Sequence, residues 1–159
     1  MNTVYLLLGS NMGNSEQTLS VAINMIEKNI GKVTNSSSIY KTAAWGNENQ
    51  PDFLNQIVVA SSLLTAPAVL HQIFAIEKEI GRVRTTKYAA RVIDIDILFF
   101  NDEIIHTQNL IIPHLQIQNR KFVLIPLAEV APFYQHPLLK KTAKELLRNC
   151  TDKLNVQKN

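Results

Sequence analysis

The segment Ile93-Asp94-Ile95-Asp96-Ile97-Leu98-Phe99-Phe100 decides how the fold of this chain is interpreted. It is rich in β-branched and aromatic residues, a composition typical of a strand. Successive side chains of a strand point to opposite faces, so Asp94 and Asp96 would share one face. Their Cα atoms would lie about 6.6 Å apart, at roughly 3.3 Å per residue. We therefore predict a strand over 93–100 that presents two carboxylates side by side.

A strand and a helix are predicted immediately before this segment. Residues 65–81 favour a helix, because Thr65 and Pro67 are typical of a helix start and Gly81 of a helix end. Its apolar stripe comprises Leu70, Ile73, Phe74 and Ile80. Residues 53–64 favour a strand, one side of which comprises Ile57, Val59 and Leu63.

Two further strands and a helix are predicted towards the N-terminus. The apolar run from Val4 to Leu8 is followed by Gly-Ser-Asn, which favours a buried strand and a turn. Asn14 or Ser15 can cap a helix that ends at Gly31. The apolar stripe of this helix comprises Leu19, Ala22, Ile23, Ile26 and Ile30. A polar, partly exposed strand is predicted over 33–40 and a loop over 41–52.

The order of these elements predicts the fold class. After the strand at 93–100 we expect a loop to His114, an apolar stretch over 122–130 and a short helix with a capping box at Thr142 and Glu145. The series strand, helix, strand, strand, helix, strand matches an α+β ferredoxin-like sandwich, with helices on one face of an antiparallel sheet. The remaining C-terminal residues would form an appendage.

Composition limits the function classes. The 159 residues are 46% apolar and carry a net charge of +3, which indicates a single folded domain over residues 1–159. The one cysteine cannot form an intrachain disulfide. Neither a signal peptide nor a membrane span is apparent, so we expect a cytoplasmic protein with no membrane partner. The lysines are scattered and do not form the basic stripe of a nucleic-acid binder.

Arginines cluster around the aspartate pair. Arg82 and Arg84 precede the strand, and Arg91 lies three residues before Asp94. Guanidinium groups suit phosphate oxygens, and carboxylates suit divalent cations. Each feature alone is equally compatible with a solvated loop or a solvated strand edge, but together they favour Mg²⁺-nucleotide chemistry.

A second group of residues could grip a planar heterocycle. Phe53 and Asn55 would share one strand face, after a loop that contains the only tryptophan, Trp45. An aromatic ring can stack on a heterocycle while an amide pairs with its edge. Phe122 could supply a second wall, although a single phenylalanine is more often a core residue.

Two other polar residues are open to two interpretations. Glu77 falls on the predicted buried stripe, where a carboxylate needs a partner; it is either a ligand-binding acid or a boundary residue. His114 is either structural or a donor to phosphate.

Together these stretches resemble the 6-hydroxymethyl-7,8-dihydropterin pyrophosphokinase family of folate biosynthesis. The resemblance covers about residues 3–132. It rests on Leu8-Gly9-Ser10-Asn11, Gln50-Pro51-Asp52-Phe53-Leu54-Asn55, Gly81-Arg82-Val83-Arg84, Arg91 with Asp94-Ile95-Asp96-Ile97, Pro113-His114, and Asn119-Arg120 with Phe122-Val123-Leu124 and Pro126-Leu127.

The resemblance implies transfer of pyrophosphate from ATP to the pterin hydroxymethyl group, with release of AMP. We expect a single domain that acts as a monomer. Asp94 and Asp96 would hold two Mg²⁺ ions, and Arg82 and Arg91 would stabilise charge on the transferred group. The residues implied for ATP binding are Glu77, Arg84, Ile97, His114 and Arg120. The residues implied for pterin binding are Thr42, Ala43, Trp45, Phe53, Asn55 and Phe122.

Two departures and two alternatives accompany this resemblance. Phe53 stands where the family often has tyrosine, and Tyr88-Ala89-Ala90-Arg91 replaces a Trp-Gly-Pro-Arg stretch. An RNA-binding domain of the same topology would use aromatic residues on its sheet, but two acids in a central strand would repel RNA. A metal-dependent phosphodiesterase could also use the aspartate pair.

Overall fold

The computed structural model describes residues 1–44, 49–83 and 89–159 of the chain. Along the described residues the elements are, in order, β1 (Asn2–Ser10), α1 (Ser15–Asn29), β2 (Gly31–Ser36), β3 (Tyr40–Thr42), β4 (Phe53–Ser62), α2 (Ala66–Ile80), β5 (Asp94–Phe100), β6 (Ile105–His106), β7 (Ile111–Ile112), a 3₁₀ turn (Ile117–Asn119), α3 (Lys121–Val130), α4 (Ala143–Asn149) and β8 (Val156–Lys158).

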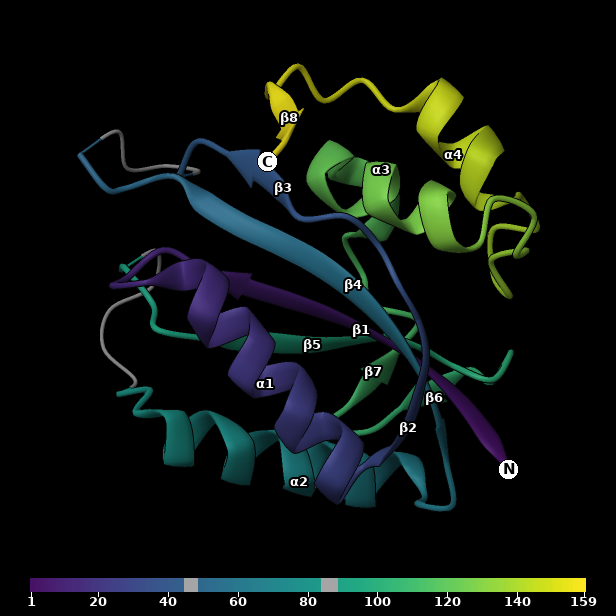
Figure 1. Cartoon of the computed structure of the whole chain (residues 1–159). Coiled ribbons are helices and arrows are strands. Elements are labelled where there is room, and N and C mark those ends of the chain that lie inside the picture. The colour runs from purple at the N-terminus through teal and green to yellow at the C-terminus, as the bar shows by residue number, and fades with distance from the viewer. Residues whose placement is uncertain (45–48, 84–88) are drawn as a thin grey trace.

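An antiparallel sheet forms the centre of the molecule (Figure 1). Its strand order is β5-β1-β4-β3-β8, and β2 also pairs with β4. Strands β2 and β3 lie one after the other along the same edge of β4, separated at Ser37. There the Ser37 hydroxyl accepts a hydrogen bond from Ile57 N at 2.9 Å, so the predicted strand over 33–40 is interrupted. The α+β ferredoxin-like architecture with an antiparallel sheet is confirmed.

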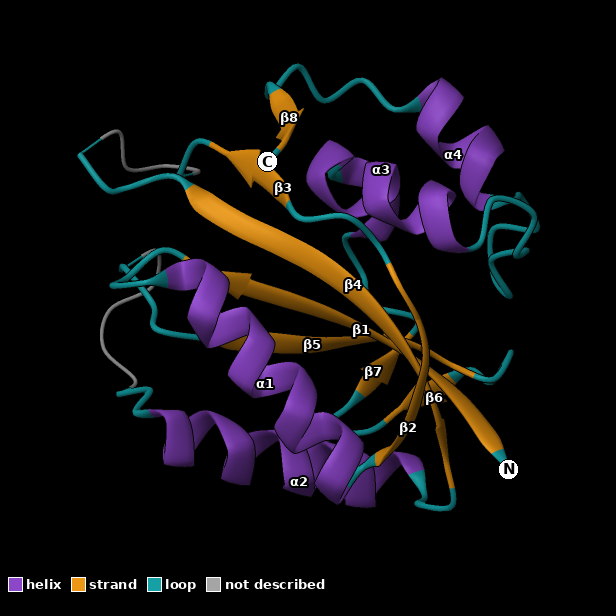
Figure 2. Ribbon diagram, viewed as in Figure 1, coloured by secondary structure: helices purple, strands orange, loops and turns teal. Residues whose placement is uncertain are grey.

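Helices cover both faces of this sheet, and not only one (Figure 2). Helices α1 and α2 pack on one face, over a core that includes Leu6 and Leu8 of β1. Leu7 points the other way, into a second core formed with α3 and α4. Alternation along a strand makes this division possible, because both faces of the central strands are apolar. The stretch predicted as an appendage therefore forms a second helical layer.

Most predicted helix ends are confirmed. The Asn14 side chain accepts a hydrogen bond from Gln17 N at the start of α1, and Thr142 and Glu145 form the predicted capping box of α4. Gly81 ends α2 with a φ of 113°. Gly31, however, is the first residue of β2 and not the end of α1; a Cβ there would lie 2.1 Å from the Ser61 carbonyl oxygen, so only glycine allows this pairing with β4.

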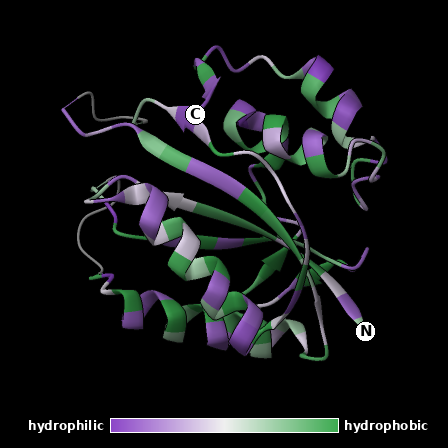
Figure 3. Ribbon diagram, in the orientation of Figure 1, coloured by the Kyte–Doolittle hydropathy of each residue, from purple (hydrophilic) through white to green (hydrophobic). Residues whose placement is uncertain are grey.

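Phe74 does not belong to the buried stripe predicted for α2, and Leu63 does not continue the strand side that was predicted to include Ile57 and Val59. Phe74 is 47% exposed and Leu63 is 83% exposed. Helices α1 and α2 carry hydrophobic and hydrophilic residues in turn along their length (Figure 3). In α2 the buried residues are Ala66, Val69, Ile73, Ile76 and Glu77, and Ile73 is the one member that the predicted stripe shares with them. Leu63 lies in the turn after β4, where the alternation of the strand no longer applies.

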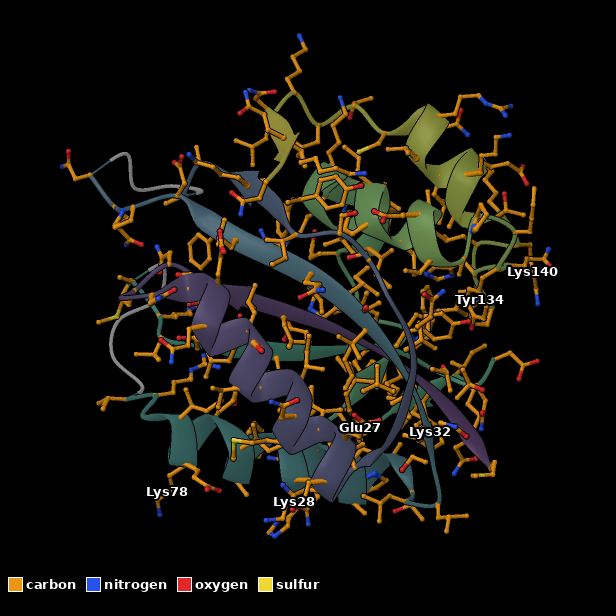
Figure 4. The ribbon with its side chains drawn as sticks, viewed as in Figure 1. Glu27, Lys28, Lys32, Lys78, Tyr134 and Lys140 are labelled. Carbon is orange, nitrogen blue, oxygen red and sulfur yellow. The ribbon has the colours of Figure 1, made fainter. Side chains whose placement is uncertain are left out.

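Most lysines among the described residues are exposed, as their scattered positions suggest. Lys28, Lys32, Lys78 and Lys140 are exposed and point away from the body of the protein (Figure 4). Within the described residues, no helix has the length and apolar character needed to cross a membrane.

Candidate active site

The strand register brings the predicted site residues onto one face of the sheet. Gly9 of β1 pairs with Asn55 of β4 on one side and with Asp94 of β5 on the other. Two residues earlier, Leu7 pairs with Asp96 in the same way. The face that carries these residues is the one on which α3 packs. Consequently, two stretches far apart in the sequence, 53–55 and 94–96, lie on either side of β1.

A pocket of about 520 Å³ opens over this face. Its volume lies in the range of small-molecule sites, which is roughly 300–1,000 Å³. The pocket is lined by Leu7, Gly9, Thr42, Ala43, Phe53, Asn55, Ala89, Arg91, Asp94, Asp96, Gln116, Asn119, Arg120, Phe122, Asp152 and Leu154. One end is therefore aromatic and amide-bearing, and the other is charged.

Two arginines hold Asp94 at the charged end. Its Oδ1 accepts from Arg82 Nη1 and its Oδ2 accepts from Arg91 Nη1, each at 2.7 Å. Arg82 also donates to Glu77, which lies on the buried face of α2. The side chains of Arg82 and Arg91 are 13% and 30% exposed. Ion pairs this sheltered are screened far less than surface pairs.

Glu77 joins the end of α2 to the start of β5. Its Oε2 accepts from Ile95 N at 3.0 Å. Burial raises the pKa of Glu77 despite the opposing effects of the Ile95 amide and of Arg82. Glu77 is 3% exposed and is therefore not a boundary residue; its carboxylate holds Arg82 and the Ile95 amide.

Asp96 differs from Asp94 in its surroundings. Within the described part of the chain, no hydrogen bond or ion pair reaches its carboxylate. Burial, followed by repulsion from Asp94 and Glu77, raises the pKa of Asp96 to about 7. A partly buried carboxylate in this position favours a cation. The described residues contain no cluster of three metal-binding side chains, so the remaining ligands of such an ion would be phosphate oxygens and water.

His114 and Arg120 lie beyond the aspartate pair. The amide of His114 donates to Leu98 O of β5 at 3.1 Å, and its Nδ1 accepts from Gln116 N at 3.2 Å. Burial lowers the pKa of His114, and Arg120 lowers it further. Arg120 precedes α3 and also offsets the charge of Asp96. Arg120 thus lines the pocket, and His114 lies behind the lining, where it is bonded to Gln116.

The aromatic end is built around Asn55. This residue is 4% exposed, and its Nδ2 donates to Thr42 Oγ1 at 3.2 Å. Gly9 makes room for it, since a Cβ on Gly9 would lie 2.9 Å from Asn55 Oδ1. Phe53 and Phe122 line the same pocket, and the Arg120 guanidinium carbon lies 5.8 Å from the centre of the Phe122 ring. A flat heterocycle fits this combination of rings and a fixed amide.

Comparison with known proteins agrees with this geometry. The family model described as 7,8-dihydro-6-hydroxymethylpterin-pyrophosphokinase (HPPK) matches residues 5–132. The chain belongs to the HPPK family. It is 41% identical over 145 residues to the 2-amino-4-hydroxy-6-hydroxymethyldihydropteridine pyrophosphokinase of Aquifex aeolicus, an alignment that covers 91% of this chain and 90% of that protein. The enzyme of that name from Bacillus subtilis is 42% identical over 130 residues, covering 81% and 78% of the two chains.

Solved structures share the HPPK fold. Wild-type Plasmodium falciparum HPPK-DHPS with pteroate superposes with a TM-score of 0.79 at 21% identity. The superposition covers 92% of this chain and 42% of that one. The chain therefore spans less than half of that longer protein, and the likeness concerns the fold alone. The family match leaves the RNA-binding and phosphodiesterase hypotheses without support.

Nine of the residues that the HPPK resemblance singled out line this pocket, and Glu77, Arg82 and His114 lie behind its lining. Of the other three, one packs in the core and two lie outside the described residues. The side chain of Ile97 is 5% exposed and packs in the core beneath α1 and α2. Only its main chain is left to contact a nucleotide. Arg84 and Trp45 lie outside the described residues, as does Tyr88.

One residue beside the pocket, Asn11, was not a functional candidate in the sequence analysis. Asn11 is 2% exposed and joins three segments. Its Nδ2 donates to Gln50 Oε1 at 3.0 Å and to Pro51 O at 3.1 Å, while its Oδ1 accepts from Arg91 N at 2.8 Å. Its position in the turn after the first strand was visible in the sequence, but its partners were not.

Proposed function

We propose that this chain transfers a pyrophosphoryl group from ATP to the hydroxymethyl oxygen of 6-hydroxymethyl-7,8-dihydropterin, releasing AMP. The supporting observation is a single pocket that joins a ring-and-amide end to a carboxylate-and-arginine end. Membership of the HPPK family agrees with this activity. A bisubstrate reaction needs both ends on one surface, because the two reactants must be held within bonding distance.

The aromatic end would bind the pterin. Phe53 and Phe122 would stack on the ring, and Asn55, Thr42 and Ala43 would pair with its edge. The buried amide of Asn55 is already oriented by its hydrogen bond to Thr42. Such fixed polar groups select a ligand by its donors and acceptors, because a ligand that lacks them leaves buried groups unpaired.

The charged end would bind and activate ATP. The pterin hydroxyl oxygen forms a bond to the β-phosphorus, with loss of its proton, as the bond from that phosphorus to the α,β-bridging oxygen breaks. Arg82 and Arg91 would stabilise charge on the transferred group. A guanidinium has five N–H donors, so each arginine can hold Asp94 and a phosphate oxygen together. Glu77 would orient Arg82, and His114 and Arg120 would contact the rest of the nucleotide.

We propose Asp94 and Asp96 as the ligands of two Mg²⁺ ions. When bound, the metal neutralises phosphate charge and orients the ATP chain. The two carboxylates project from one strand face into the same pocket, and within the described residues no hydrogen bond or ion pair reaches the carboxylate of Asp96. The chain contributes the position and spacing of both carboxylates.

The nucleotide product tests this proposal directly. Purified protein, ATP, Mg²⁺ and the reduced pterin should yield AMP and a pterin pyrophosphate in equal amounts. A dihydropterin with a methyl in place of the hydroxymethyl group is the matched control, and it should yield no AMP. Release of ADP, or AMP formation that ignores the hydroxyl group, would contradict the assignment.

The remaining expectations concern partners. We propose a monomer without a nucleic-acid partner, whose ligands are ATP and the pterin. Light scattering after gel filtration should give the mass of one chain, and a single-stranded RNA should not co-elute with it. A dimer mass would correct the first expectation without affecting the reaction.

A further inference from the structure

The C-terminal residues 150–159 reach the pocket although they lie outside the stretch that matches the HPPK family. Asp152 and Leu154 both line it. Strand β8 follows them and pairs with β3, and it also contacts α3 (Figure 1). The segment 150–159, called here the C-terminal strap, therefore passes over the aromatic end of the pocket.

One end of the strap is fixed to α3. Asp152 Oδ2 accepts from Lys121 N at 3.0 Å, and its Oδ1 accepts from Leu154 N at 3.0 Å. Lys121 is the first residue of α3, where a backbone N–H has no partner within the helix. A carboxylate is favoured there by the helix dipole as well. Lys121 lies between Arg120 and Phe122, so Asp152 fixes the backbone that carries both side chains.

The other end of the strap is fixed to β3. Val156 pairs with Thr42 and Lys158 with Tyr40. Asn159 N donates to Ile39 O at 2.8 Å, which extends this pairing by one bond. Thr42 in turn accepts the hydrogen bond from Asn55. The strap thus connects the two walls of the aromatic end: Phe122 on α3, and Thr42 with Asn55 on the strands.

We propose that the C-terminal strap determines pterin affinity by holding these two walls at the correct spacing, with Asp152 as the positioning residue and Leu154 as an apolar part of the wall. This inference rests on the proposed function. Within the described residues, the hydrogen bonds of Asp152 involve α3 and the strap itself, and none involves Arg82, Arg91 or Asp94. Binding of the pterin should therefore depend on the strap more strongly than binding of ATP, whose proposed contacts adjoin the anchor of the strap only at Arg120.

Three variants test the strap. Asp152→Ala removes both acceptors, Asp152→Asn keeps one acceptor oxygen, and Leu154→Ala shortens the apolar wall. We expect Asp152→Ala to raise the Kd and KM for the pterin about tenfold, which corresponds to one lost hydrogen bond to a charged group. Asp152→Asn should give an intermediate increase and Leu154→Ala about a three- to fivefold increase. In each of the three variants, the Kd for ATP should rise clearly less than the Kd for the pterin.

Matched controls separate this role from general destabilisation. Lys153→Ala changes an exposed residue of the same strap, and Leu63→Ala truncates a leucine that is 83% exposed. Both should leave the pterin KM unchanged. Circular dichroism and thermal melting check the fold, and if Asp152→Ala does not fold, Asp152→Asn and Leu154→Ala decide the question.

A wrong strap proposal and a wrong functional assignment would give different results. Absence of AMP release by the unaltered chain would refute the proposed function. Normal turnover by the unaltered chain, with a pterin KM that changes less than twofold in the folded strap variants, would refute the strap alone. An equal rise in the Kd values for ATP and for the pterin would also refute the strap proposal, because that result indicates a general loosening of the pocket.

Discussion

Asp94 and Asp96 have the same side chain, lie two positions apart in β5 and line the same pocket, yet we expect them to contribute oppositely to stability. Asp94 receives two guanidinium groups at 2.7 Å, whereas burial and like charges raise the pKa of Asp96 to about 7. An acid whose pKa is higher in the folded state binds more protons folded than unfolded. Its unfavourable contribution is therefore absent below about pH 4 and complete above about pH 7.

The paired asparagine variants should consequently shift stability in opposite directions. In metal-free protein at pH 8, Asp96→Asn should raise the free energy of unfolding by about 1–2 kcal/mol, because it removes a charge that burial and the neighbouring carboxylates disfavour. Asp94→Asn should destabilise by about 1–3 kcal/mol, because two arginines lose their shared partner. Urea denaturation at pH 8 and at pH 5 measures both effects. The gain from Asp96→Asn should shrink at pH 5; a gain that is independent of pH would show that Asp96 is not the titrating group.

Asn11 provides a second prediction for a single residue. Its donors hold Gln50 and Pro51, and its acceptor holds Arg91. Asn11→Ala should lower kcat/KM about 10- to 100-fold. The reason is that the segment 50–51 before β4 and the backbone at Arg91 before β5 each lose an anchor. Asn11→Asp keeps an acceptor for Arg91 N but loses both donors, so it should raise the pterin KM more than the ATP KM. Equal changes in the two KM values of Asn11→Asp would argue against separate roles for the two halves of this amide.

At the scale of elements, α3 depends on a carboxylate at its far end. Glu129 accepts from Ser38 N at 2.9 Å, from Ser38 Oγ at 2.8 Å and from Tyr40 Oη at 2.5 Å. Burial opposes ionisation, but the hydrogen bonds from Tyr40 and Ser38 outweigh it and lower the pKa of Glu129. These bonds tie α3 to the strand edge that also receives β8.

Glu129→Gln and Tyr40→Phe should each destabilise the protein, by about 1 kcal/mol or less because the carboxylate is exposed to screening. A depressed pKa contributes stability above the pKa of the unfolded chain and loses it as the pH falls through the folded value. The effect of Glu129→Gln on urea unfolding should therefore be seen at pH 7 and vanish near pH 3. Strictly additive effects in the double variant would show that the two side chains do not interact.

Periodicity within each element allowed much of the fold to be predicted. The alternation in 93–100 correctly placed Asp94 and Asp96 on one face, and the helix caps at Asn14, Gly81 and Thr142 were correct. Periodicity could not show that helices cover both faces of the sheet, because an apolar stretch such as 122–130 does not indicate which surface it packs against. Phe74 was misplaced for a related reason, since neighbouring stripes on one helix differ by only about 100°.

At the scale of the whole molecule, the sequence could indicate the pocket residues that lie within strands. It could not indicate those that the C-terminal part of the chain adds to the pocket. Phe53, Asn55, Asp94 and Asp96 each lie a few residues after a turn that can be recognised in the sequence. Asp152 and Leu154 follow α3 and α4 in the chain, and they reach the same pocket because of the way those helices pack. Their contribution depends on tertiary contacts, which no local pattern records.

The two ends of the pocket should respond independently to substitution. A ligand at about 100 times its Kd stabilises the folded state by about 2.7 kcal/mol, which raises Tm by roughly 5–10 °C in a chain of this size. Asp96→Ala should lose turnover and the Mg²⁺-dependent part of the ATP-induced shift, yet keep the shift caused by the pterin. Asn55→Ala should show the reverse, because it removes the buried amide and leaves the charged end intact. EDTA should reproduce the effect of Asp96→Ala in the unaltered chain. If both substitutions abolished both shifts, the pocket would act as one indivisible site, and the assignment of its two ends to two substrates would have to be abandoned.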